Sequence, residues 1–168
     1  MPLGCLRGFV FASLVVILNL HSHALAQGTV RHVIPPAGTT HVQTLSQNWS
    51  DETAEWFYNL PQGSKLLPYD WFINLEQPFS LALFRDPAHF ASMGYIARTA
   101  DAANPEALAI GFVRDGQHVG MTCAACHTGV IRHQGTAFLI DGGQTLGDFE
   151  TFLRRLETSV KQTAVAGP

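Results

Sequence analysis

The chain has 168 residues, 46% of them hydrophobic and 14% charged, with a formal net charge of −3 at pH 7. This length is enough for one domain with its own hydrophobic core. The charge is mildly acidic and forms no basic stripe, which argues against nucleic acid or an anionic membrane as a partner.

Residues 1–26 have the pattern of a secretory signal peptide. Arg7 gives a short positive region, an apolar run extends from Phe9 to Leu20, and Ala24-Leu25-Ala26 forms an A-x-A cleavage site. The apolar run is short for a bilayer span, and an uncleaved anchor is the alternative. The sequence therefore predicts a periplasmic or secreted protein that starts at Gln27 and has no membrane span after cleavage.

A polar arm and a first helix follow the leader. Residues 27–48 show no sustained hydrophobic period and include a Pro-Pro pair, so we expect an extended arm before a domain at 49–168. Ser50 is a good helix N-cap. Trp56, Phe57 and Leu60 predict the face on which that helix packs.

The middle of the chain alternates aromatic-rich turns with short elements. Residues 62–75 crowd aromatic and leucine side chains around Pro68, which predicts a core-forming turn that also walls a cofactor pocket. Asp86-Pro87 predicts a helix start, and Gly94 its end. Residues 107–113 form an apolar stretch whose state the pattern does not decide.

The most informative stretch is Cys123-Ala124-Ala125-Cys126-His127, a C-x-x-C-H sequence. Two thiols on one helical turn can each form a thioether to a haem vinyl group, and the adjacent histidine can bind the iron. A thioredoxin-like redox pair would need a βαβ context, which is not visible here. A structural zinc site would need four ligands, and the sequence has no second Cys pair.

The cysteine count agrees with haem attachment. Cys5 precedes the apolar run and would be removed with the leader, which leaves Cys123 and Cys126 in the mature chain. A secreted chain with two thiols, both in C-x-x-C-H, is not a disulfide scaffold. We therefore predict one covalently attached haem c, bound by these two cysteines and by His127 as the iron ligand.

Two further elements follow the motif. Residues 130–133 and 136–140, joined by Gln134-Gly135, predict a short hairpin. From Thr145 onward, apolar residues recur at helical spacing and predict an amphipathic helix: Leu146, Phe149, Phe152, Leu153, Leu156 and Val160. The sequence thus predicts a mainly α, cytochrome c-like haem domain with a long N-terminal helical and loop extension and a short β-hairpin after the motif.

Five segments carry a family resemblance: residues 56–64, 67–72, 110–113, 122–129 and 140–143. Together they resemble the periplasmic di-haem cytochrome c peroxidase-like family, which includes rubber oxygenase-like haem dioxygenases. The resemblance covers the N-terminal haem domain alone. Members of the family are longer and carry a second haem motif, so it implies either a single-haem relative or the N-terminal part of a longer enzyme.

The second axial position of the iron decides between electron transfer and oxygen chemistry. Candidate ligands are Met93 and His89 on the predicted 86–94 helix, His133 in the hairpin, and His118 and Met121 close before the motif. An open site is the alternative, and the pattern selects none of these.

The sequence therefore favours a periplasmic c-type cytochrome domain that transfers electrons to a redox partner protein. The alternative is the N-terminal part of a haem peroxidase or dioxygenase with an open iron site, whose partner is a missing C-terminal haem domain.

Overall fold

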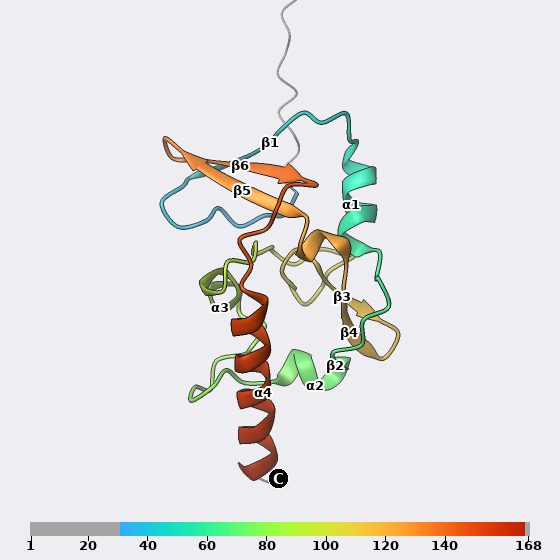
Figure 1. Ribbon diagram of the computed structural model, residues 1–168, viewed down its shortest axis with the longest axis vertical. Coiled ribbons are helices and arrows are strands. Elements are labelled where there is room, and N and C mark those ends of the chain that lie inside the picture. Colours follow the sequence, from blue (N-terminus) through green and yellow to red (C-terminus); the bar gives the residue numbers. More distant parts are fainter. Residues whose placement is uncertain (1–30, 167–168) are drawn as a thin grey trace, which may run out of the picture.

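The computed structural model describes residues 31–166, so the predicted signal peptide and cleavage site lie outside the described residues. Within that range the chain forms four α-helices, one 3-10 helix and two three-stranded sheets (Figure 1). The fold is mixed α/β, and the prediction of a mainly α, cytochrome c-like domain is wrong. The error arose because four of the six strands form by pairing with distant or ambiguous segments, which local periodicity does not reveal.

The first sheet joins the N-terminal arm to the predicted hairpin. Its order is β1 (His41–Thr44), β6 (Thr136–Asp141) and β5 (Thr128–His133). The β5–β6 pair is antiparallel, which confirms the hairpin, whereas β1 runs parallel to β6. The described part of the arm is therefore fixed to the domain by strand pairing.

The second sheet was not predicted. It contains β2 (Leu67–Pro68), β4 (His118–Met121) and β3 (Phe112–Asp115), with both neighbouring pairs antiparallel. The turn between β3 and β4 contains Gly116 at a φ of +60°. An Asp-Gly turn flanked by apolar residues is a hairpin signal. Of the ambiguous stretch 107–113, the last two residues belong to β3 and the others form a loop.

Helix starts follow the sequence closely. The Ser50 side chain accepts a hydrogen bond from the Thr53 amide and caps α1 (Asp51–Asn59). Asp86 caps α3 (Pro87–Ser92) by accepting from two amides. Helices α2 (Tyr69–Asn74) and α4 (Phe149–Ala166) complete the set, and α4 begins four residues after the predicted Thr145 start.

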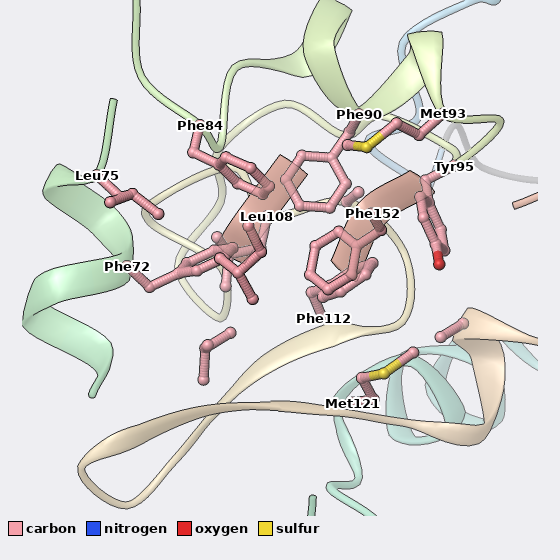
Figure 2. Close-up of a cluster of buried hydrophobic side chains, with 14 of the residues drawn as sticks. Phe72, Leu75, Phe84, Phe90, Met93, Tyr95, Leu108, Phe112, Met121 and Phe152 are labelled. Carbon is pink, nitrogen blue, oxygen red and sulfur yellow. The ribbon is translucent and has the colours of Figure 1, made fainter. Parts of the chain in front are cut away.

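The main core is a cluster of aromatic rings contributed by several elements (Figure 2). Phe90 of α3, Phe112 of β3 and Phe152 of α4 lie at its centre, with ring centroids 4.8 to 5.9 Å apart. Edge-to-face and tilted ring pairs at these separations stabilise a core beyond the apolar area that they bury. This cluster attaches α4 to the rest of the domain.

Several aromatic positions face solvent instead of the core. Of the predicted face of α1, Phe57 packs against the core, whereas Trp56 is 61% exposed and Leu60 is 48% exposed. The buried residues of α1 are Ala54 and Tyr58. In the turn at 62–75, Phe72 is fully buried whereas Trp71 is 66% exposed. That turn supplies core residues. None of the described helices is both long and apolar enough to cross a bilayer.

Candidate functional site

The C-x-x-C-H segment forms a 3-10 helix, η1 (Cys123–Ala125), and a turn that leads into β5. Ala124 and Ala125 are buried at 1% and 2% exposure, whereas Cys123, Cys126 and His127 are exposed. Both thiols are free. The motif thus places its two alanines against the domain and presents its reactive side chains outward.

Backbone hydrogen bonds fix the motif from both sides. The Cys123 carbonyl accepts from the amides of Cys126 and His127 at 3.2 and 2.9 Å. The Cys126 carbonyl accepts from the Thr145 amide at 3.0 Å, and the His127 carbonyl accepts from the Gly142 amide at 2.8 Å. The motif backbone therefore has fixed partners within itself and in the segment between β6 and α4.

Gly111 lets the preceding chain approach the motif closely. It has a φ of +93°, and a Cβ placed on it would lie 2.2 Å from the Ala125 Cα. Its carbonyl accepts from the Thr122 amide at 2.9 Å. The Thr122 hydroxyl then accepts from the Ala124 amide at 3.2 Å and caps η1. A residue larger than glycine at position 111 would displace the motif.

A buried polar network lies behind the motif. Asp141, at the end of β6, accepts hydrogen bonds from the Tyr58 hydroxyl at 2.5 Å and from the Arg31 guanidinium. It pairs in register with Thr128, the residue after His127. Burial and then the Asp141 carboxylate raise the pKa of Tyr58. For Arg31, burial opposes the charged form, but Tyr58 and Asp141 outweigh it and raise the pKa.

Tyr95 is the polar member of the aromatic core nearest the motif. Its ring packs 5.0 Å from that of Phe112, and Figure 2 shows its hydroxyl pointing away from the neighbouring rings. Burial raises the pKa of Tyr95 to about 12, and Cys126 and Asp148 contribute in the same direction. Tyr95 therefore links the core to the neighbourhood of Cys126 and remains neutral at physiological pH.

Three of the candidate second iron ligands are in the core. Met93 and Met121 are 2% and 5% exposed and belong to the aromatic cluster. His89 is 9% exposed and packs on Phe84 with ring centroids 4.8 Å apart. Burial, followed by the charge of Arg155, lowers the pKa of His89. These side chains have structural contacts in the apolar interior.

The other two candidates lie at strand ends. His133 is the last residue of β5, six residues from His127, or roughly 20 Å at about 3.3 Å per residue. His118 pairs with Asp115 beside the β3–β4 turn. Between residues 31 and 166, no three His, Cys, Asp or Glu side chains form a group that could hold a bare metal ion. The described chain thus supplies no second ligand cluster beside His127.

The residue pattern predicts the motif but not its supports. Asp141 and Gly111 lie in segments 140–143 and 110–113, which carry the family resemblance, and the pattern predicts no structural role for them or for Arg31. A glycine inside an apolar run was the available signal for Gly111, because it indicates close backbone approach. The pairing of Arg31 with Asp141 spans 110 residues, and a single sequence carries no signal for it.

Comparisons with known proteins add one relative. The chain is 35% identical, over an alignment of 137 residues, to the uncharacterized protein y4iJ of Sinorhizobium fredii (strain NBRC 101917 / NGR234). The match covers 66% of this chain and 22% of the relative, so the chain matches less than a quarter of that protein's length. No protein-family description matches the chain. No solved structure matches it either.

Proposed function

We propose that this chain is a periplasmic c-type haem domain that carries one covalently attached haem and transfers electrons. The main support is the exposure pattern of the motif: the Cys123, Cys126 and His127 side chains are exposed, and the two alanines between the cysteines are buried. Free, outward thiols three residues apart, directly followed by an outward histidine, are what haem attachment requires. The bound haem would supply an iron that exchanges single electrons.

The residues have separate roles in this proposal. The Cys123 and Cys126 thiols would each add across a haem vinyl group, with sulfur bonding one carbon and hydrogen the other. His127 would offer one imidazole nitrogen to the iron. The hydrogen bonds from Gly142 and Thr145 to the motif carbonyls hold the backbone in place, which limits reorganisation at the site. Leu146, which is 71% exposed and follows Thr145, adds apolar surface that a porphyrin would cover.

The test is expression of the full chain with a bacterial haem-attachment system. The pyridine haemochrome spectrum should be that of a haem with two thioether bonds. Cys123→Ala and Cys126→Ala should each give the spectrum of a single thioether, and haem should become extractable by acid and organic solvent in the double variant. His133→Asn changes an exposed histidine at the far end of β5 and serves as the control. A colourless wild-type protein would refute the proposal.

A second candidate is the N-terminal part of a haem peroxidase or dioxygenase with an open iron site. It is favoured by the burial of Met93, Met121 and His89, whose side chains pack against other core residues and not at the exposed motif. The ferrous haem-loaded protein separates the two functions. Rapid carbon monoxide binding supports the enzyme, whereas a tight six-coordinate spectrum that excludes carbon monoxide supports the electron carrier.

A further inference from the structure

A cavity of about 630 Å³ lies beside β5. Residues of β5, of α3 and of the segment 34–37 line it. This volume is within the range of small-molecule sites, roughly 300–1,000 Å³. Most of its wall is aliphatic or proline and comes from three separate segments: Ile34, Pro36, Ala88, Ala91, Ile96 and Val130. Such a wall favours the hydrocarbon part of a ligand.

Two polar side chains of β5 mark the ends of this cavity. Thr128, Val130 and Arg132 alternate along the strand and line the same wall. Thr128 is 1% exposed, and its buried hydroxyl has no hydrogen-bond partner among residues 31–166. Arg132 is exposed and lies four residues further along, or roughly 13 Å at about 3.3 Å per residue. The cavity thus has an unsatisfied hydroxyl at one end and a cation at the other.

Arg132 is fixed at its end of the cavity. Its Nη1 donates a hydrogen bond to the Ala37 carbonyl at 3.2 Å, which leaves the remaining guanidinium donors available. Among the described residues that line the cavity, none is an aspartate or glutamate that would neutralise this charge. On the opposite wall, Ser92 accepts a hydrogen bond from Arg155 at 2.8 Å, which adds a second positive charge nearby. The charges therefore favour an anion over a cation.

We propose that this cavity binds an aliphatic carboxylic acid that carries a hydrogen-bonding oxygen at its far end. The carboxylate binds Arg132, the chain lies over Val130 and Ile96, and the distal oxygen bonds the Thr128 hydroxyl. A plain hydrocarbon would leave that buried hydroxyl unsatisfied, which costs free energy. The cavity shares Leu146 with the surface proposed above for the haem, but the ligand contacts at Arg132 and Thr128 do not require the haem.

The experiment is a calorimetric titration of the haem-loaded protein with ω-hydroxydecanoate below its micelle concentration. We expect one site per chain. Decanol, which lacks the carboxylate, should bind about tenfold more weakly or worse, because hydrogen bonds to charged groups contribute about 1.5–3 kcal/mol. Decanoate, which lacks the distal hydroxyl, should bind several-fold more weakly, because a neutral hydrogen bond contributes about 1 kcal/mol.

Variants assign the two ends. Arg132→Gln should remove the preference for decanoate over decanol, and Thr128→Val should remove the preference for ω-hydroxydecanoate over decanoate. Ala91→Trp, at an exposed helix position on the cavity wall, should abolish binding. Arg154→Gln removes an exposed arginine elsewhere, on α4, and should leave all affinities unchanged. Arg132 is exposed, so its variant remains informative if Thr128→Val fails to fold.

Three results would overturn the proposal. The first is equal binding of decanoate and decanol, which would mean that Arg132 selects nothing. The second is binding to haem-free protein that disappears after haem attachment, because the cavity reaches Tyr95 and Leu146 and the haem itself would then fill it. The third is the absence of measurable binding to either form.

Discussion

Replacing Asp141 with asparagine tests whether the buried network holds the domain together behind the motif. The Asp141 and Arg31 side chains are 1% and 5% exposed, so water screens this ion pair little. Asparagine keeps the size of the side chain and an oxygen for the Tyr58 hydroxyl, but it removes the negative charge. Arg31 then remains charged and buried, and the carboxylate still near it is that of Asp51, which lies 3.5 Å from its Nε and is 53% exposed.

The expected cost is about 3–5 kcal/mol, the range found when one partner of a buried ion pair is removed. Because a domain of this size has a total stability of about 5–15 kcal/mol, this loss is a large part of the whole. It corresponds to a fall in Tm on the order of 10–20 °C. Urea unfolding, followed by circular dichroism, should show a lower midpoint with an unchanged m-value.

Two further variants calibrate this number. Glu157→Gln breaks an ion pair whose side chains are 63% and 72% exposed, so solvent screening should make its cost much smaller than that of Asp141→Asn. Tyr58→Phe removes one donor to the carboxylate and should cost about 1.5–3 kcal/mol. The reasoning fails if Asp141→Asn lowers the free energy of unfolding no more than Glu157→Gln does. The buried ion pair would then stabilise the fold no more than an exposed one.

Three other measurements probe the same framework. Gly111→Ala should lower the free energy of unfolding by more than about 4 kcal/mol and reduce haem incorporation, because the added Cβ would overlap Ala125. Gly116→Ala is the control: this glycine also has a positive φ but lies in open space, so the change should cost about 1–2 kcal/mol in the same unfolding assay. The folded state keeps Tyr95 protonated, so the contribution of Tyr95 to the free energy of unfolding should be fully present below pH about 10 and be lost as the pH rises through about 12. Tyr95→Phe should lessen this decline when unfolding is measured at alkaline pH. Ser50→Ala removes the cap of α1 and should lower the free energy of unfolding by about 0.5–2 kcal/mol, measured by denaturant titration.

Local sequence signals predict the helix starts and one hairpin. Ser50 and Asp86 cap helices because a short polar side chain can reach amides that have no partner within the helix. The Gln134-Gly135 turn joins two strands because both residues adopt positive φ. These features depend on residues close in sequence, and a single sequence is sufficient to predict them.

Features that depend on distant pairing were not predictable. Strand β1 forms because His41–Thr44 pair with β6, almost a hundred residues later, and nothing within residues 27–48 marks them as a strand. The packing face of α1 was only partly predictable. Phe57 packs against the core as expected, but Trp56 is exposed. Tyr58 is buried instead, because its hydroxyl donates to Asp141 and the Arg31 and Arg98 guanidinium groups lie 5.9 and 5.6 Å from its ring centroid.

The candidate site shows the same division. The reactive residues lie within five positions, so their spacing could be read directly, whereas the contacts that orient them come from Gly111, Gly142 and Thr145. These contacts hold backbone atoms and leave the Cys123, Cys126 and His127 side chains outside. Since thioether formation needs the side chains alone, it should tolerate changes in the supports better than iron coordination does, because the imidazole must keep one orientation. Defects in the scaffold should therefore alter the iron spectrum before they prevent covalent attachment.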